Sequence, residues 1–280
     1  MKKTKKQTVG FFYRRDNLRA ISWEKKIRSW LRTHHRSVRI VNRNPSILLV
    51  LGGDGTILEA ARTYRGRKTL IAGLNLGKVG FLATARKSSQ FLPALSSILK
   101  NTHTVTERTM VSARVTRRGK NVFSANALND IVLQNPVGLV EIDVVIEGYP
   151  VQRIRGTGAL VATSTGSTAY NLSAHGPIVM PDIACLIVTE ILDHDIPTPS
   201  IVVGSDKRIK LRINDFRKRG LFSTKGGEPL DVILVADGHE TFALQKGDVV
   251  SVTQSPYSVQ FAETKKNYFF KSLEEQFLIQ

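Results

Sequence analysis

The pattern of apolar and polar positions changes near residue 102, and the change predicts two kinds of structure in one chain. Before it, β-branched and apolar runs alternate with segments whose apolar residues recur every three or four positions. Strands that alternate with helices favour a parallel sheet with helices on its faces. The expected strands are residues 8–13, 37–42, 47–52 and 69–75, and the expected helices pass through residues 20–31, 57–64 and 88–100.

After residue 102 the chain reads as a series of short strands. Two segments of alternating apolar and polar residues meet at RRGKN, residues 117–121, which predicts a β-hairpin. We therefore expect an all-β domain, in which residues 214–230 form an exposed loop or a hairpin insertion. Further runs of strand type are residues 139–148, 151–163, 184–192, 200–204, 208–213, 231–237, 240–244 and 248–254.

The last segment returns to helical spacing. Phe269, Leu273 and Phe277 recur every four positions, which predicts an amphipathic helix that packs back on the first domain. The expected domains are an α/β domain of residues 1–101, completed by residues 262–280, and a β domain of residues 102–261.

Composition indicates a soluble globular protein. The 280 residues are 41% hydrophobic, and no apolar run approaches the roughly 18 residues that a membrane-spanning helix needs. The single cysteine, Cys185, lies in an apolar run, so no disulfide forms within the chain and a buried thiol is expected. These features predict a cytoplasmic protein without a membrane partner.

The charge of the chain limits the classes of partner that it is expected to bind. The formal net charge is +18, and residues 1–43 carry fourteen Lys or Arg against Asp16 and Glu24. Such an excess suggests polyanions: nucleotides, polyphosphate or nucleic acid. Nucleic-acid modules usually interleave basic residues with aromatic ones, and only 7% of this chain is aromatic. A solvated basic face is therefore favoured over a nucleic-acid site.

The first motif with chemical content is GGDGT, residues 52–56, which follows an apolar strand. We expect a sharp strand-to-helix turn with Thr56 as the helix N-cap, where backbone N–H groups suit phosphate. Asp54 would repel phosphate unless a phosphate-borne Mg²⁺ bridges to it, or unless it faces a hydroxyl about to be phosphorylated. Both arrangements point to phosphoryl transfer to an alcohol.

Two further motifs suggest nucleoside binding. In STGSTAYNLSAHGP, residues 164–177, a short helix from Ala169 would put Tyr170 and Ser173 on one face, where they could hold an adenine. A Ser/Thr-rich connection between strands is the plainer alternative. In ALNDIVL, the pair Asn129 and Asp130 could bind a ribose diol, although a turn or bulge also explains it.

With NLGKVGFLA at residues 75–83, these motifs occur in the order and approximate spacing found in the NAD kinase family, which the chain resembles over nearly its whole length. GGDGT is shared with diacylglycerol-type lipid kinases and, in variant form, with phosphofructokinases, whereas TGSTAYNLSA is highly specific. The resemblance implies a Rossmann-like α/β domain followed by a β-sandwich domain. It also implies phosphoryl transfer from ATP, or from polyphosphate, to the adenosine ribose 2′-hydroxyl of NAD.

The resemblance also implies roles for individual residues. Asp54 would accept the proton of that hydroxyl. Asn129 and Asp130 would bind ribose hydroxyls. The remaining nucleotide-binding residues would be Gly53, Gly55, Thr56, Asn75, Phe81, Arg155, Thr157, Thr168, Ala169, Tyr170, Asn171, Leu172, Ser173 and His239. No residue is expected to bind a metal directly, because Mg²⁺ would arrive with ATP. Relatives are homodimers or homotetramers, so a homo-oligomer is expected.

The chain departs from the family pattern at three positions. Thr157, in Gly156-Thr157-Gly158, stands where the family usually has an aspartate that contacts substrate. His175 replaces a common glycine and is expected to be structural. His239 stands where many relatives have glutamine and could contact bound nucleotide. A lipid kinase and a non-enzymatic, basic nucleic-acid-binding protein are the alternatives, but neither explains TGSTAYNLSA.

Overall fold

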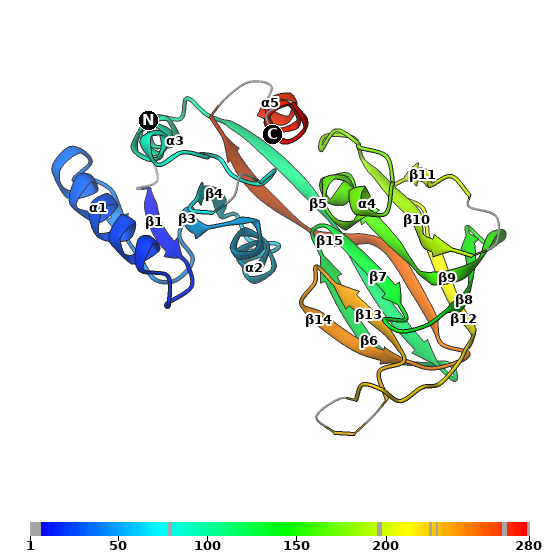
Figure 1. Cartoon of the computed structure of the whole chain (residues 1–280). Helices are drawn as coiled ribbons and strands as arrows, with labels where there is room; N and C mark the ends of the chain where they lie inside the picture. Colours follow the sequence, from blue (N-terminus) through cyan, green and yellow to red (C-terminus); the bar gives the residue numbers. More distant parts are fainter. Residues whose placement is uncertain are drawn as a thin grey trace. The chain divides into compact units, whose positions relative to one another are not determined.

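The structure, a computed structural model, describes residues 7–77, 80–194, 198–223, 226–227, 229–264 and 268–278. The chain forms two compact units (Figure 1). Unit 1 consists of residues 1–108 and 258–280, and unit 2 consists of residues 109–257. The two long strands β5 (Thr104–Arg117) and β15 (Val249–Glu263) contribute residues to both units.

Unit 1 is an α/β fold built on a parallel sheet in the order β2-β1-β3-β4-β15. Its other strands are β1 (Thr8–Phe12), β2 (Arg39–Ile40), β3 (Ile47–Gly52) and β4 (Leu70–Asn75). Its helices are α1 (Leu18–His34), α2 (Asp54–Tyr64), α3 (Phe91–Leu99), α5 (Tyr268–Phe277) and the 3₁₀ turn η1 (Ser88–Gln90). The alternating pattern predicted this architecture correctly.

Strand β3 forms the centre of unit 1. All six of its residues are buried, as expected for a continuous apolar run with strands on both sides. Ile47, Leu49 and Leu51 belong to a core cluster that also contains Ile27 of α1 and Phe91 of α3. The two helices therefore supply the apolar cover that holds β3, and with it the turn after Gly52, in place.

The C-terminal helix belongs to unit 1, as the spacing of its aromatic residues predicted. The Arg86 guanidinium forms an ion pair with Glu275 of α5 at 2.7 Å. Phe269 is buried, and its ring centroid lies 6.3 Å from that of Phe81. Helix α5 is thus joined by charge and by packing to the segment that follows β4.

Unit 2 is built from antiparallel strands with two apolar clusters, a large one and a smaller one. Val111 and Val144 belong to the large cluster, which draws on β5 to β10 and β12 to β15, and Val132 belongs to the smaller one. This is the expected β-sandwich class. The strands are β6 (Lys120–Ala127), β7 (Asp130–Gln134), β8 (Val140–Ile146), β9 (Tyr149–Thr163), β10 (Cys185–Asp193), β11 (Ile201–Gly204), β12 (Ile209–Phe216), β13 (Val232–Ala236) and β14 (Glu240–Leu244).

Two local predictions in unit 2 can be compared with the structure. The predicted hairpin at residues 117–121 is confirmed: Arg117 pairs with Lys120, and Arg118 and Gly119 between them have φ of 49° and 77°. Two positive φ values suit the twist of a two-residue hairpin turn. Within the expected insertion 214–230, β12 continues to Phe216, and Thr224, Lys225 and Glu228 lie outside the described residues.

In the part of the chain that the structure describes, no helix is both long and apolar enough to cross a membrane.

The central position of β3 gives a stability prediction. Leu49 is fully buried, so Leu49→Ala should lower the free energy of unfolding by about 2–5 kcal/mol through lost burial and a residual cavity. Leu18, which is 79% exposed in α1, provides the matched control, and Leu18→Ala should change the free energy of unfolding by less than about 0.5 kcal/mol. Urea denaturation measures both variants. Equal destabilisation would contradict the assigned core.

Candidate functional site

The acidic turn of GGDGT lies at the carboxyl end of β3. Asp54 is the first residue of α2, and Gly53 is the N-cap, with an extended backbone at φ −89° and ψ −175°. The prediction of Thr56 as the N-cap was therefore wrong. Glycine at position 53 lets the chain turn directly out of the strand, so the helix begins three residues earlier than predicted and Thr56 lies within its first turn. There the Thr56 N–H donates to the Gly53 carbonyl at 3.0 Å.

The glycines around Asp54 differ in the space they leave. A Cβ at Gly53 or Gly55 would meet no atom within 4 Å, so this backbone is open to a ligand. By contrast, a Cβ at Gly80 would lie 2.2 Å from Asp54 Oδ1. Glycine is required at position 80 because the chain passes directly over the carboxylate, whereas at positions 53 and 55 it leaves room for a bound group.

The segment after β4 holds the Asp54 carboxylate. Strands β3 and β4 are parallel neighbours in which Gly52 pairs with Asn75, so their carboxyl ends lie at one edge of the sheet. From the following segment, the Phe81 N–H donates to Asp54 Oδ2 at 3.0 Å. The NLGKVGFLA motif therefore acts partly through its backbone, although Lys78 and Val79 lie outside the described residues.

Burial controls the charge of Asp54. Desolvation raises the pKa of its carboxyl above the ordinary value, while hydrogen bonds from the Phe81 and Leu82 N–H groups and the positive charge of Arg86 oppose the rise. Sequence analysis did not single out Arg86, because the ATARKSS segment carries no motif. Its role depends on the fold, which brings Arg86 near Asp54 and ties it to Glu275 of α5.

Asn75 has a structural environment. Its side chain is 5% exposed, and its Oδ1 accepts from the Gly77 N–H at 3.0 Å while its Nδ2 donates to the Gly77 carbonyl at 3.3 Å. The amide therefore folds back on the turn that follows β4. Its expected role as a nucleotide contact stays a prediction.

In unit 2 the expected ribose and adenosine residues gather at one end of three neighbouring strands. Strand β7 begins at Asp130, β9 ends at Thr163 and β13 ends at Ala236, and their register pairs Asp130 with Ala162 and Ile131 with Ala236. Because the strands are antiparallel, these ends lie side by side. Asn129 directly precedes β7. The segment from Thr168 to Ser173 follows the end of β9, and His239 follows the end of β13.

Asp237 connects this group and was missed by sequence analysis. Its carboxylate accepts from the Leu128 N–H at 2.9 Å and from the Asn129 N–H at 2.8 Å. Its own N–H donates to the Asp130 carbonyl at 3.2 Å. In the sequence, an Asp-Gly pair after a strand predicts only a turn. Only the structure shows that this turn binds the backbone of residues more than a hundred positions away.

Asp130 is 5% exposed, and burial, with a smaller contribution from the negative charge of Asp237, raises its pKa to about 7. The carboxyl therefore changes its protonation state near neutral pH. Asn129 is 9% exposed, and its carbonyl accepts from the Thr163 N–H at 2.8 Å. A Cβ at Gly166 would lie 2.1 Å from that carbonyl oxygen, so glycine lets the TGSTAYNLSA segment lie directly on Asn129.

The TGSTAYNLSA segment forms the 3₁₀ turn η2 (Thr165–Thr168) and the short helix α4 (Tyr170–Ser173), with Ala169 as the N-cap. The predicted short helix is confirmed. Tyr170 is 38% exposed, and Ser173 is exposed as well, so both are accessible to a ligand. Thr168, Ala169 and Leu172 are half-buried.

Asn171 differs from its neighbours because it is fully buried. Its Nδ2 donates to the carbonyls of Ser167 at 3.2 Å and Pro177 at 3.0 Å, and its Oδ1 accepts from Thr189 at 2.8 Å. The side chain thus fastens the turn. His175 has φ of 61°, a left-handed conformation that suits the glycine usual at this position in the family.

Arg155 and Thr157 are not placed with the other expected residues of unit 2. They lie on β9, where Thr157 is six residues, or about 20 Å of strand, from the Thr163 end. Arg155 is exposed and lines a different pocket with Arg217 and Arg219. The flanking Gly156 and Gly158 allow close strand pairing, because a Cβ on either would lie within 2.6 Å of a neighbouring carbonyl oxygen.

His239 lies in the three-residue loop between β13 and β14. It is exposed, and its N–H donates to the Ala236 carbonyl at 3.0 Å. Across the described ranges, no group of three or more His, Cys, Asp or Glu side chains is placed to hold a metal ion.

Comparisons with known proteins agree with this architecture. A family model described as the ATP-NAD kinase N-terminal domain matches residues 1–103, and one described as the ATP-NAD kinase C-terminal domain matches residues 128–264. The NAD kinase of Symbiobacterium thermophilum is 37% identical over 82% of this chain and 77% of its own length. That of Nitratidesulfovibrio vulgaris is 33% identical over 89% of this chain and 88% of its own length.

Two solved structures share the fold. Yeast NADH kinase in complex with NADH has a TM-score of 0.84 and 20% identity, covering 98% of this chain and 88% of its own. An NAD kinase from Archaeoglobus fulgidus in complex with ATP has a TM-score of 0.74 and 24% identity, covering 96% and 99%. The fold is thus that of the two-unit NAD and NADH kinases. By the family models and the identity to its relatives, the chain belongs to the NAD kinase family.

The raised pKa of Asp130 predicts a pH-dependent stability. Between pH 3.8 and about 7 the folded state keeps a proton that the unfolded state has released, so the wild-type protein should lose stability as pH rises through this window. Asp130→Asn removes this contribution. The free energy of unfolding of the variant, relative to wild type, should therefore be higher at pH 7.5 than at pH 4.5.

Urea denaturation at the two pH values measures this difference. Asp16→Asn, at a carboxylate that is 73% exposed, controls for the loss of one formal charge. If the difference between Asp130→Asn and wild type is the same at both pH values, Asp130 is not desolvated in the folded protein.

Proposed function

We propose that this chain transfers a phosphoryl group to the adenosine ribose 2′-hydroxyl of NAD, with ATP or polyphosphate as the donor. The observation that carries the proposal is the Asp54 turn: a half-buried carboxylate, held by the Phe81 N–H, beside backbone that is open at Gly53 and Gly55. Membership of the NAD kinase family supports the choice of NAD as acceptor.

In this mechanism Asp54 orients the acceptor hydroxyl and takes its proton. Phosphoryl transfer has a loose transition state, so positioning and neutralisation of charge contribute more than early proton removal. Its raised pKa makes Asp54 a better base than an exposed aspartate, although still a weak one beside an alcohol. The first turn of α2, which contains Gly55 and Thr56, presents the positive end of the helix to phosphate oxygens.

A divalent cation, Mg²⁺, fits a site with one carboxylate and open backbone, because it is commonly bound by one or two carboxylates together with substrate phosphates. When bound, it neutralises charge on the phosphates. The proposal therefore assigns Mg²⁺ to the nucleotide and no separate metal site to the protein.

Unit 2 supplies recognition of the adenosine portion in this proposal. Asn129 and Asp130 bind ribose hydroxyls, and Thr168, Ala169 and the exposed face of α4 contact the base. Asn171 holds α4 in place through its fully buried side chain, which donates to the Ser167 and Pro177 carbonyls. His239, Asn75, Phe81 and Leu172 complete the proposed nucleotide contacts. Arg155 and Thr157 are left out of this set, because they lie further along β9. The proposal also includes a homo-oligomer, dimer or tetramer, in the cytoplasm.

Formation of NADP tests the proposed function. Purified protein with NAD, Mg²⁺ and ATP, or with polyphosphate in place of ATP, should yield NADP. Asp54→Asn keeps the shape of the side chain but removes the base, so kcat should fall by about 10²–10⁴-fold while NAD binding is largely retained. Glu59→Gln, at an exposed carboxylate of the same helix, should leave kcat unchanged.

Near wild-type turnover of Asp54→Asn would exclude Asp54 as the proton acceptor. Absence of NADP with both donors would instead contradict the proposed reaction. The alternatives would then be a lipid kinase or a nucleic-acid-binding protein.

The exposed ring of Tyr170 gives a separate prediction about binding. Tyr170→Leu removes a stacking surface, so the KM for NAD should rise about tenfold with little change in kcat. Tyr149, which is 74% exposed on β9, provides the control, and Tyr149→Leu should leave KM unchanged. Steady-state kinetics with varied NAD measures both. An unchanged KM for Tyr170→Leu would show that the ring does not contact the substrate.

A further inference from the structure

The order of the parallel strands in unit 1 indicates where a ligand meets its sheet. The order is β2-β1-β3-β4, so the chain leaves β1 toward one side of the sheet and leaves β3 toward the other. In open α/β sheets, ligands bind outside the carboxyl ends of the two strands where the order reverses. Asp54 directly follows one of these strands, β3. The residues after β1 are therefore placed to contact the same ligand.

The end of β1 lies next to the end of β3. Phe12, the last residue of β1, pairs with Val50, and β3 continues for only two further residues, to Gly52. The connection from β1 to α1, residues 13–17, thus begins beside the strand end from which the Asp54 turn departs. A side chain from the start of α1 can therefore reach this edge of the sheet.

Arg19, in the first turn of α1, is anchored at this edge. Its guanidinium donates to the Leu76 carbonyl at 2.9 Å, and the Leu76 N–H donates to the Gly52 carbonyl at 3.3 Å. One backbone residue thus connects the arginine to the strand end that precedes Asp54. Within the described ranges, the Leu76 carbonyl is the only acceptor that Arg19 binds, so most N–H groups of its guanidinium remain for a ligand.

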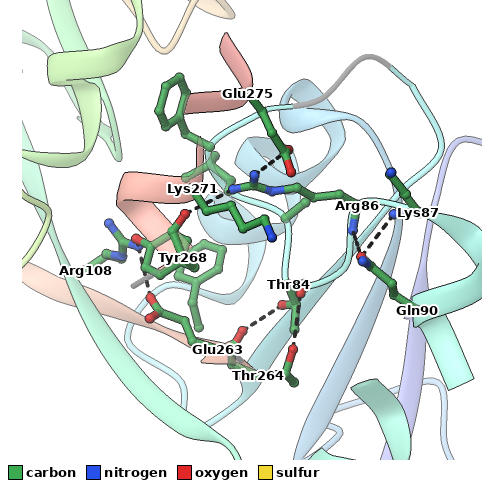
Figure 2. A pocket seen from close by; sticks show the side chains of 15 residues that line it. Thr84, Arg86, Lys87, Gln90, Arg108, Glu263, Thr264, Tyr268, Lys271 and Glu275 are labelled. Atoms are coloured by element: carbon green, nitrogen blue, oxygen red, sulfur yellow. Dashed lines mark hydrogen bonds and ion pairs between the residues drawn. The ribbon is translucent and has the colours of Figure 1, made fainter. Parts of the chain in front are cut away.

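Arg86, whose charge also acts on Asp54, differs from Arg19 in its partners. Its guanidinium forms an ion pair with Glu275 at 2.7 Å and donates to the Tyr268 carbonyl at 3.3 Å (Figure 2). In the part of the chain that the structure describes, Arg19 forms no ion pair. Its side chain is exposed, so its suitability as a phosphate ligand depends on its anchored position and unused donors rather than on burial.

We propose that Arg19 binds the phosphate groups of the phosphoryl donor, ATP or polyphosphate, at the carboxyl edge of the unit 1 sheet. The inference rests on the proposed function and adds a donor-binding residue to it. The planar guanidinium can bind one phosphate through two N–H groups at once, which fixes orientation as well as position. The Leu76 carbonyl limits the movement of the side chain and so lowers the entropy cost of that contact.

The donor is favoured over NAD as the ligand of Arg19. In the proposed function, unit 2 recognises the adenosine portion of NAD, whereas the open backbone at Gly53 and Gly55 belongs to unit 1. A triphosphate or polyphosphate also carries more negative charge than the pyrophosphate diester of NAD. The positive charge after β1 matches the more highly charged ligand, because Arg15, in the same connection, likewise forms no ion pair among the described residues.

Isothermal titration calorimetry with the full chain, in the absence of NAD, tests the assignment. The probes are Mg²⁺–ATP and Mg²⁺–tripolyphosphate, which has no nucleoside. Arg19→Gln keeps an N–H donor but removes the charge, so the affinity for each probe that the wild type binds should fall about tenfold. Arg19→Lys should retain most of the affinity, because an ammonium group also binds phosphate. The affinity of Arg19→Gln for NAD, measured separately, should equal that of the wild type.

Arg32→Gln is the matched control. Arg32 is an exposed arginine in the last turn of the same helix, about 20 Å of helix from Arg19, and its replacement removes the same charge. This variant should bind both probes as the wild type does. In steady-state kinetics, Arg19→Gln should raise the KM for the donor and leave the KM for NAD unchanged, a division that a general loss of structure would not produce.

Four results would overturn the proposal. They are no binding of either probe by the wild-type chain at about 10 mM, equal affinities of Arg19→Gln and Arg32→Gln for the probes, equal losses of affinity for NAD and for the donor in Arg19→Gln, and a loss for ATP without a loss for tripolyphosphate that the wild type binds. Binding is measured without turnover. A chain that binds the donor through Arg19 but forms no NADP would therefore contradict the proposed function alone.

Discussion

The contact between the Asp54 carboxylate and the backbone after β4 is the interaction on which the arrangement of unit 1 depends. A carboxylate placed in an environment that disfavours its charge needs compensating donors, and here the Phe81 and Leu82 N–H groups supply them. This requires β3 and β4 to be parallel neighbours with Gly52 opposite Asn75. It also requires glycine at position 80, where the chain crosses the carboxylate.

Through helix α5, the C-terminal segment of the chain also affects the surroundings of Asp54. Arg86 follows the residues that bind Asp54, and its guanidinium is held by Glu275, Ser272 and the Tyr268 carbonyl. The same arginine lowers the pKa of Asp54 by its charge. A helix more than two hundred residues away in sequence thus helps to place the charge that acts on the proposed base.

Unit 2 contains a similar arrangement, in which the carboxylate of one aspartate binds backbone N–H groups of the distant ALNDIVL motif. Asp237 accepts from the N–H groups of Leu128 and Asn129 and so holds the start of β7 against the end of β13. Asp130 itself is buried, and this burial, with a smaller contribution from the negative charge of Asp237, raises its pKa to about 7. In both units, then, burial raises the pKa of a carboxyl group of the proposed site, and in unit 1 backbone N–H groups oppose that rise.

The sequence by itself determined the fold class, the alternation of strands and helices, the hairpin at Arg118-Gly119 and the family. These follow from periodicity and turn chemistry, which act over a few residues, and from motifs that are continuous in the chain. Only the tertiary structure decided that Arg86 lies near Asp54, that Asp237 binds the backbone before Asp130, and that Asn171 is buried. Each of these depends on which distant strand ends become neighbours, and local patterns carry no information about that pairing.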